Sequence, residues 1–399
     1  MLPYDLFSPN FKRNPFPTFA AMRRSHPVYP HRAPSGDTIW YVTRYHDVVT
    51  ILKDNDHFVK DVRRARPHAA NTADPKHIRD SINKNMLFSD PPDHTRLRSL
   101  VNQAFTPRRV ADSAPRVQAV ADQLLDTAVK NSPFDLIADF ALPLPVRVIC
   151  DMLGIPPEDQ AQVAQWSQAI ISPGSRNLTF RMRKRYIRQF VRYLHGLFAA
   201  RQQAPQDDLI TALVQAEEAG DRLSEAELSS MVALLLVTGH ETTVNLIGNG
   251  MLALLQHPEQ LAWLRENLEE METAVEELLR YDGPVETSTT RWVARDTVFC
   301  GQLMRRGDIM RPVITSANRD ETVFDHADTL ILTRTPNRHL AFGHGIHYCL
   351  GAPLARLEGH IAFTTLLSRF PKLQLALPLD QLQWRSGVLF RGLQALPVT

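Results

Sequence analysis

Residues 341–352, A-F-G-H-G-I-H-Y-C-L-G-A, concentrate side chains that can do chemistry. Two histidines and several glycines surround Cys349 here, in a chain of 399 residues that has 3 cysteines. Four kinds of site use such residues: a phosphate-binding loop, a zinc site, a nucleophilic thiol and a haem ligand. The neighbouring residues favour one of them.

The first three chemistries meet obstacles in the sequence. G-H-G-I-H-Y-C lacks the third glycine of a dinucleotide-binding fingerprint, and no β-α-β pattern with a downstream acid surrounds it. A zinc ion usually has four ligands, whereas His344, His347 and Cys349 offer three on a glycine-rich loop. A catalytic thiol remains open, but it needs a base and an orienting partner that the sequence does not identify.

A lone thiolate at the start of a helix fits an axial ligand of haem iron. Cys349 leads directly into L-G-A-P-L-A-R-L-E, in which Pro353 suits a first helical turn. The amino end of that helix and the amides after Cys349 would stabilise the negative charge of the sulfur. The covalent haem signature C-x-x-C-H is absent, so the expected haem is held without thioether bonds.

A second polar cluster lies in the middle of the longest predicted helix, residues 224–256. S-E-A-E at its start forms a capping box, and the helix is predicted to end before His257-Pro258. At ~1.5 Å per residue it would be roughly 50 Å long, which is typical of the central helix of a core. Its middle, T-G-H-E-T-T from Thr238 to Thr243, places polar groups where burial is greatest, and such groups need partners or a cavity.

Two interpretations of this segment remain open. Gly239 and the hydroxyl residues could open the backbone ladder of the helix at a functional site, or the helix could bend with its polar groups satisfied internally. H-E-T-T-V also begins like the zinc-protease motif H-E-x-x-H, but valine stands where the second histidine is required. We therefore expect no zinc here.

The remaining pattern predicts a mainly α fold with a small β region. Helical periodicity appears at residues 91–105, 115–130, 157–171, 180–203, 259–281 and 352–369. Strand-like runs are short and lie at Thr38 to Thr43, Trp292 to Phe299 and the C-terminal stretch. Since no linker, repeat or low-complexity segment interrupts the chain, we expect one large domain over residues 1–399.

Composition narrows the function classes. Three widely separated cysteines, Cys150, Cys300 and Cys349, argue against a disulfide framework and for a reducing compartment. A formal net charge of +2 gives no signal for nucleic-acid binding. The longest apolar run, Met231 to Val237, is too short to cross a membrane, and the first residues do not resemble a signal peptide, so we expect a cytoplasmic protein.

F-G-H-G-I-H-Y-C-L-G resembles the haem-binding signature of the cytochrome P450 monooxygenases. The matching positions are Phe342, Gly343, Gly345, His347, Cys349 and Gly351. T-G-H-E-T-T resembles the oxygen-activating segment of the long central helix of that family, and E-L-L-R, Glu277 to Arg280, resembles its E-x-x-R pair. A-N-R-D and G-A-P-L-A-R-L-E are similar to soluble bacterial members, and the resemblance covers roughly residues 5–397.

Two positions depart from the family pattern. Thr238 stands where alanine or glycine is usual, and Glu321 follows A-N-R-D where proline is usual. Neither touches the core chemistry, although Thr238 could alter the oxygen pocket.

The resemblance implies the cytochrome P450 fold, haem b as the cofactor and a monooxygenase activity of the kind found in secondary metabolism. One atom of dioxygen would enter a hydrophobic small-molecule substrate by hydroxylation or epoxidation. Cys349 would ligate the iron, and the other positions implied to bind the cofactor are His94, Arg98, Arg291, His347, Phe342 and Gly343. The positions implied to line the substrate pocket are Val237, Thr238, Val285, Thr289, Val388 and Leu389.

Glu241 and Thr242 match the acid and alcohol of the family. Cleaving the O–O bond consumes protons, so a hydroxyl beside the iron and an acid that relays protons from solvent are the expected design. Thr243 is the competing hydroxyl. Glu277 and Arg280 are implied to be a structural pair, completed by Arg334 or His339, that holds the loop carrying Cys349.

The partners follow from the same resemblance. Electrons are expected from a separate ferredoxin or flavodoxin, because no flavin or ferredoxin segment is recognisable in the chain. The alternative function is a haem-thiolate binding or sensing protein without turnover, which would have no need of a proton relay such as Glu241 and Thr242.

Two basic segments correspond to the lids over the distal pocket in the family. The first carries Arg181, Arg183, Lys184, Arg185, Arg188 and Arg192, and the second carries Lys60, Arg63, Arg64 and Arg66. Charge runs on surface helices are common, and the functional hypothesis is that these two attract an anion, either a free carboxylic acid or an acyl group on an acidic carrier protein. An ordinary solvated helix face is the alternative.

Overall fold

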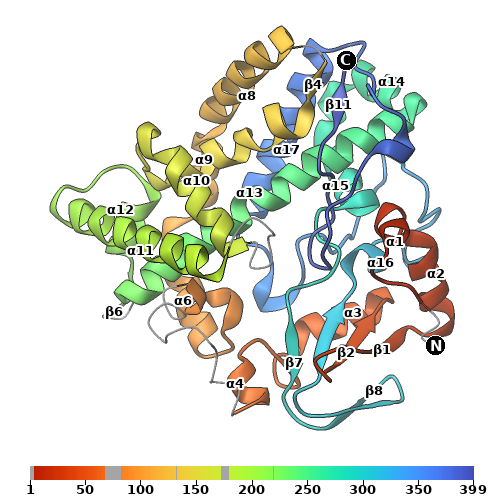
Figure 1. The fold of residues 1–399 in the computed structure, drawn as a ribbon, viewed down its shortest axis with the longest axis horizontal. Coiled ribbons are helices and arrows are strands. Elements are labelled where there is room, and N and C mark those ends of the chain that lie inside the picture. Colours follow the sequence, from red (N-terminus) through yellow and green to blue (C-terminus); the bar gives the residue numbers. More distant parts are fainter. Residues whose placement is uncertain (1–3, 68–81, 132, 172–178, 219) are drawn as a thin grey trace. The chain divides into compact units, whose positions relative to one another are not determined.

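A computed structural model describes residues 4–67, 82–131, 133–171, 179–218 and 220–399. It is mostly helical with a small amount of sheet, as predicted (Figure 1). The chain forms two compact units: unit 1 comprises Met1–Ala69, Ala121–Pro143 and Thr242–Thr399, and unit 2 comprises Ala70–Val120 and Leu144–Glu241. Organisation as one domain over residues 1–399 stays a prediction.

A five-stranded sheet in unit 1 has the order β1-β2-β10-β7-β3 (Figure 1). Its strands are β1 Val28–Arg32, β2 Thr38–Val42, β10 Ile309–Pro312, β7 Arg291–Val293 and β3 Phe58–Val59. β2 pairs antiparallel with β1 and parallel with β10. Two-stranded sheets also form between β8 Thr297–Phe299 and β9 Gln302–Met304, and between β4 Phe134–Asp135 and β11 Pro397–Val398.

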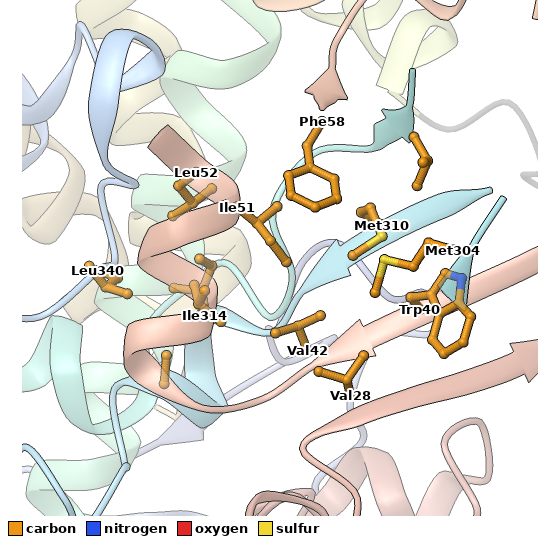
Figure 2. Packing of buried hydrophobic residues seen from close by; sticks show 13 residues of the cluster. Val28, Trp40, Val42, Ile51, Leu52, Phe58, Met304, Met310, Ile314 and Leu340 are labelled. Atoms are coloured by element: carbon orange, nitrogen blue, oxygen red, sulfur yellow. The ribbon is translucent and has the colours of Figure 1, made fainter. Parts of the chain in front are cut away.

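β2 contributes apolar side chains to both faces of the sheet. Side chains of a strand alternate between faces, so Trp40 and Val42 join one cluster while Tyr41 joins another. Figure 2 shows the first cluster, in which Ile51 and Leu52 of α3 (Tyr45–Lys53) lie with residues from the strands. The end of α3 is therefore packed against the sheet through Ile51 and Leu52.

Unit 1 contains further helices of very different lengths. They are α1 Pro9–Arg13, α2 Phe16–Ser25, α4 Val62–Ala65, α14 Pro258–Glu266, α15 Met271–Asp282, α16 Ile314–Ala317 and α17 Ala352–Arg369, with a π-helical turn at Ile137–Ala141. Single-turn 3₁₀ segments lie at Val129–Asn131, Leu268–Glu270, Gly345–His347 and Leu379–Gln381.

Two predicted elements are divided in the structure. The expected helix 259–281 is wrong as one helix, because Asn267 leaves helical geometry and its side chain donates to the carbonyl of Trp263 at 2.8 Å. The expected strand Trp292 to Phe299 divides into β7 and β8. The pairing of β7 with β3 ends with the bond from Ala294 to the carbonyl of His57, and Asp296 then accepts from the amide of Arg306 between the two strands.

Unit 2 is built from helices. They are α6 Asp93–Ala104, α7 Pro107–Asp112, α9 Pro143–Leu153, α10 Pro157–Ile171, α11 Phe180–Gln203 and α12 Leu209–Gln215, with the short pair β5 Glu217–Glu218 and β6 Asp221–Arg222 and a 3₁₀ turn at Met86–Phe88. α8 Ala114–Ala128 begins in unit 2 and ends in unit 1. α10 and α11 run side by side (Figure 1).

α13, Glu225–Gln256, is the long helix that the capping box predicts. The amide of Ser224 donates to Glu227 at 2.9 Å, and the amide of Glu227 donates back to the Ser224 hydroxyl at 3.4 Å. By length and composition α13 could cross a membrane, but 78% of its most apolar window is buried inside the protein. The boundary between the two units falls between Glu241 and Thr242 within this helix.

Candidate active site

The loop that precedes α17 presents Cys349 at the surface of unit 1. Backbone bonds close it, because Gly343 donates to the carbonyl of Leu340 at 2.8 Å and Cys349 donates to the carbonyl of Phe342 at 2.9 Å. Pro353 occupies the first turn of α17, as predicted. The predicted residues Phe342, Gly343, His347 and Cys349 therefore lie together on one short, internally bonded loop.

Glycine is required at two positions of this loop. Gly343 and Gly345 have φ angles of +74° and +73°, in the left-handed region that residues with a Cβ rarely adopt. A Cβ on Gly345 would also lie 2.9 Å from the carbonyl oxygen of Leu52. The loop consequently lies directly against the end of α3.

Arg291 reaches the same carbonyl from β7. Its side chain is fully buried and donates to Leu52 O at 3.0 Å and to Phe58 O at 2.9 Å. Arg291 and Gly345 thus meet at Leu52, which brings one predicted cofactor-binding cation next to the cysteine loop.

Glu277 and Arg280 of α15 form the centre of a buried ionic network. Two hydrogen bonds join them, at 2.7 and 2.8 Å, and neither side chain is accessible. Arg334 also donates to Glu277, at 3.1 Å, whereas His339 contacts the neighbouring Glu276. Arg334, and not His339, therefore completes the pair of Glu277 and Arg280.

This network extends to the cysteine loop through Asn318 of the A-N-R-D motif. The carbonyl of Asn318 accepts from Arg280 at 2.9 Å, and its side-chain oxygen accepts from the amide of Leu340 at 2.7 Å. Sequence reasoning noticed the motif but assigned Asn318 no contact. The departure at Glu321 is also explained, because its carboxylate pairs with Arg23 of α2.

The T-G-H-E-T-T segment is helical without interruption. The Thr238 hydroxyl donates to the carbonyl of Leu234, one turn earlier, at 2.7 Å, so this polar group is satisfied inside the helix. The expected opening of the ladder at Gly239 is not seen. Glu241, at the end of unit 2, is buried.

Thr242 and Thr243 differ in their surroundings within unit 1. Consecutive helical residues point about 100° apart, and here Thr243 is buried while Thr242 is partly exposed. Thr243 neighbours Glu358 of α17, a fully buried carboxyl whose pKa is raised by burial to about 8, with the Thr243 hydroxyl acting against that rise. Thr243 is therefore directed at the protein interior and Thr242 is not.

The remaining predicted cofactor residues lie in unit 2. His94 is buried and Arg98 is partly buried, one turn apart on α6. Val237 and Thr238, predicted to line the substrate pocket, belong to the same unit through the first half of α13.

The other four predicted pocket residues come together in unit 1. Val285 forms a β-bridge with Phe390, and the amide of Glu286 donates to the carbonyl of Leu389 at 2.9 Å. The Thr287 hydroxyl donates to the carbonyl of Val388 at 2.8 Å. The segments 285–289 and 388–390 are therefore joined side by side, with Val285, Thr289, Val388 and Leu389 among them.

The cations of the basic segment 60–66 divide between the interior and the surface. Lys60 is buried and its ammonium group donates to the carbonyl of Thr289 at 3.0 Å. Arg63 pairs with Asp61 at 2.6 Å, and Arg66 donates to Asp37 at 2.7 Å and to Gly307 at 2.8 Å. Contacts within unit 1 engage Lys60 and Arg66, whereas Arg63 and Arg64 are exposed, so an anion-attracting role of this segment stays a prediction.

Four arginines of α11 lie at the surface. Arg181, Arg185, Arg188 and Arg192 are spaced by four, three and four residues, so they share one helix face, which we call the arginine stripe. All four are exposed, and no hydrogen bond or ion pair joins them to a residue in the described part of the chain. Ile187, Phe190 and Leu194 are buried on the opposite face.

The other two cysteines are poor nucleophiles. Burial and the nearby Asp151 raise the pKa of Cys150 to about 12. Burial and the charge of Asp47, whose carboxylate accepts from the thiol at 3.4 Å, raise the pKa of Cys300 to about 11. Neither thiol is suited to catalysis at neutral pH.

The residues present fit a haem better than a metal ion bound by protein ligands alone. In the ranges that the structure covers, no group of three or more His, Cys, Asp and Glu is placed to hold a metal ion. A single exposed thiol such as that of Cys349 suits an iron whose other ligands come from a porphyrin.

Comparison with known proteins gives a consistent result over the whole chain. Residues 166–377 match the family model described as Cytochrome P450. The chain is 45% identical to the polyketide biosynthesis cytochrome P450 PksS of Bacillus subtilis (strain 168), covering 98% of this chain and 96% of that protein. The solved structure of PksS matches with a TM-score of 0.92 over 99% of both chains.

Two further relatives inform the chemistry. The cytochrome P450 monooxygenase PikC of Streptomyces venezuelae is 41% identical, over 98% of this chain and 92% of that protein. The structure of P450BioI in complex with hexadec-9Z-enoic acid ligated acyl carrier protein matches with a TM-score of 0.88 and 39% identity, over 98% of this chain and 100% of that one.

Proposed function

This chain belongs to the cytochrome P450 family, and from that membership we propose that Cys349 is the thiolate ligand of its haem iron. The observation that carries the proposal is the exposed thiol of Cys349, on a loop shaped by two left-handed glycines and bonded to the Glu277 network through Asn318. A ligand must be held at a fixed position, and this loop has few ways to move.

The reaction class follows from the family. The protein is an oxidoreductase of the monooxygenase type, which uses haem b to insert one atom of dioxygen into a small organic molecule by hydroxylation or epoxidation. Bound haem supplies the activation of dioxygen once electrons reach it. The relatives favour this function over a haem-thiolate sensor without turnover.

The ligand assignment is tested by spectroscopy. The reduced protein with bound carbon monoxide should show the absorption band diagnostic of thiolate ligation. Cys349→His should retain haem and lose that band, because imidazole replaces sulfur. Persistence of the band in the variant would move the ligand to another residue.

Glu241 and Thr242 are proposed to handle protons. The buried carboxyl of Glu241 would take protons from solvent and the Thr242 hydroxyl would donate them to bound oxygen. The exposure of Thr242 supports this choice over Thr243, which neighbours Glu358 in the interior. Thr242→Ala should still consume reducing equivalents but release hydrogen peroxide in place of product, and Thr243→Ala is the matched control.

Haem carboxylates need cationic or hydrogen-bonding partners. His94, Arg98, Arg291 and His347 are proposed for this role, with Phe342 and Gly343 shaping the loop around the iron. Full burial of Arg291 beside the loop supports its assignment. The proposed substrate contacts are Val237, Thr238, Val285, Thr289, Val388 and Leu389.

We further propose that the substrate is a hydrophobic molecule that carries a negative charge or is delivered on an acidic carrier protein. The arginine stripe supports this, and P450BioI is a relative whose structure holds an acyl carrier protein. A long-chain acid and its methyl ester should be titrated by the haem spectral shift at low and high salt, beside the acyl group on its carrier. Equal affinity and equal salt dependence for all three would remove the proposal and leave an ordinary solvated helix face.

The remaining partners are proposed on the same basis. A separate ferredoxin or flavodoxin would supply electrons, and the protein would act in the cytoplasm as one domain. Turnover reconstituted with either electron carrier and its reductase tests the first point.

A further inference from the structure

A second ionic cluster lies beside the Glu277 network and contacts the cysteine loop directly. Glu276 and Glu277 are consecutive on α15, so their side chains leave the helix in different directions. Glu277 binds Arg280 and Arg334, as described above. Glu276 instead binds Arg356 of α17 and His339, which lies just before the loop.

The Glu276 carboxylate holds Arg356 in a two-pronged contact. Nε of Arg356 donates to one carboxylate oxygen at 2.7 Å and a terminal nitrogen donates to the other at 2.8 Å. Burial acts to raise the pKa of Glu276, but the hydrogen bonds of Arg356 and His339 outweigh it and lower that pKa to about 2. The Glu276 carboxylate is therefore ionised throughout the neutral range, and its contact with Arg356 is a charged pair there.

Arg356 contacts the loop at both of its ends. Its guanidinium group lies 4.5 Å from the ring centroid of Phe342, at the beginning of the loop. A terminal nitrogen also donates to the hydroxyl of Tyr348 at 3.4 Å, one residue before Cys349. Phe342 and Tyr348 contact each other edge-on, with ring centroids 6.3 Å apart.

His339 restrains the start of the loop through its other nitrogen. The amide of Ala341 donates to Nδ1 of His339 at 3.2 Å, which makes Nδ1 an acceptor. Nε2 lies on the other side of the ring and donates to Glu276 across 3.1 Å. One carboxylate thus fixes two side chains that touch the loop at residues 341, 342 and 348.

We propose that Glu276 is a positioning residue for the iron ligand: through Arg356 and His339 it holds both ends of the loop that presents Cys349. This inference rests on the proposed role of Cys349 as the ligand. It assigns the loop's orientation to Glu276, while Glu277 and Arg280 anchor the segment that leads into it.

The test compares Glu276→Gln with Glu272→Gln in the haem-loaded protein. Glu272 is exposed on the same helix one turn earlier, so it is a matched control for the loss of one charge. Hydrogen exchange of amides in residues 341–350 should quicken about tenfold in Glu276→Gln and stay unchanged in Glu272→Gln. The carbon monoxide band diagnostic of thiolate ligation should also disappear about tenfold faster in mild urea, with little change in the urea midpoint for global unfolding.

Arg356→Lys provides a second variant if Glu276→Gln folds poorly. Lysine keeps the charge but cannot make the two-pronged contact or stack on Phe342, so loop exchange should quicken to an intermediate degree. Unchanged loop exchange in both variants, or faster exchange spread evenly over the protein, would overturn the proposal. The exchange measurement is independent of which residue ligates the iron, so a failure of the Cys349 assignment would be recognised separately by the Cys349→His spectrum.

Discussion

Residues 60–66 and α11 both carry several cations, but the fold uses these charges in different ways. Lys60 and Arg66 are bound to carbonyl and carboxylate oxygens of unit 1, whereas the arginine stripe of α11 faces solvent. Charges held inside contribute to stability through the acceptors they satisfy. Exposed charges contribute little stability and act mainly on approaching molecules. The two segments should therefore respond to mutation in different measurements.

The largest expected effect is on stability, from Lys60→Met. Methionine keeps the apolar stem but leaves the oxygens of Thr289 and Thr290 without their donor, which should lower the free energy of unfolding by about 2–3 kcal/mol. Urea unfolding followed by circular dichroism measures this. Arg185→Met is the control on the exposed segment, and a change within about 0.5 kcal/mol is expected there. Similar losses of unfolding free energy in both variants would show that the buried and the exposed cations contribute equally to stability.

Arg66→Gln should cost about 2 kcal/mol at neutral pH, because Gly307, Asp37 and the ring of Trp292 lose contacts. The cost should shrink in acid. Hydrogen bonds from Ser35 and then from Arg66 hold the pKa of Asp37 below its ordinary value of 3.8. A lowered folded-state pKa gives stability that is present above the ordinary value and lost as pH falls through the lowered one. Urea midpoints of both proteins across the acid range measure the difference, and a constant gap would contradict the ion pair.

Charge reversal of the arginine stripe should change association kinetics. Arg185→Glu, Arg188→Glu and Arg192→Glu together should slow binding of an acidic acyl carrier about tenfold at low salt, with the difference fading at high salt. Stopped-flow measurement of the haem spectral shift gives the rate. Arg63→Glu is the control, since Arg63 lies outside the arginine stripe and pairs with Asp61. Equal rates for the triple variant and the wild type would leave the stripe without an electrostatic role.

The smallest effect is expected from Arg63→Ala. The Arg63 side chain is 72% exposed although it pairs with Asp61, and exposed pairs contribute ~0–1 kcal/mol. The thermal midpoint should therefore stay nearly unchanged. A loss as large as that of Arg66→Gln would show that residues 60–66 act as one network and not as separate contacts.

The sequence predicted those elements whose boundaries are set by residues close to each other along the chain. The capping box at Ser224 and the period of α11 are local, and both elements appear as expected. The break at Asn267 was missed because a side chain that caps a carbonyl does not alter the apolar period. The same limit applies to Lys60, whose partners at Thr289 and Thr290 are more than two hundred residues away along the chain.

The residues of the candidate site likewise fall into two groups, those of one continuous motif and those that contact it from distant parts of the chain. The cysteine loop is a continuous motif, so its residues could be recognised by their resemblance to the haem-binding signature. Asn318, Glu276 and Arg356 contact that loop or its start from other elements. Glu276 had a weak signal, since it precedes the recognised Glu277, but one sequence does not reveal which of two adjacent glutamates meets which partner.

The raised pKa values of Cys150 and Cys300 make this protein convenient for site-directed labelling. Maleimide dyes react with thiolates, and a pKa of about 11 leaves roughly one Cys300 thiol in ten thousand ionised at neutral pH. Cys150 is buried and ionises even less. With Cys349 in its proposed role as the iron ligand, a cysteine introduced by Arg188→Cys would take up a fluorophore well ahead of the native thiols. A single dye on α11 could then report the arrival of a partner without any of the native cysteines being removed.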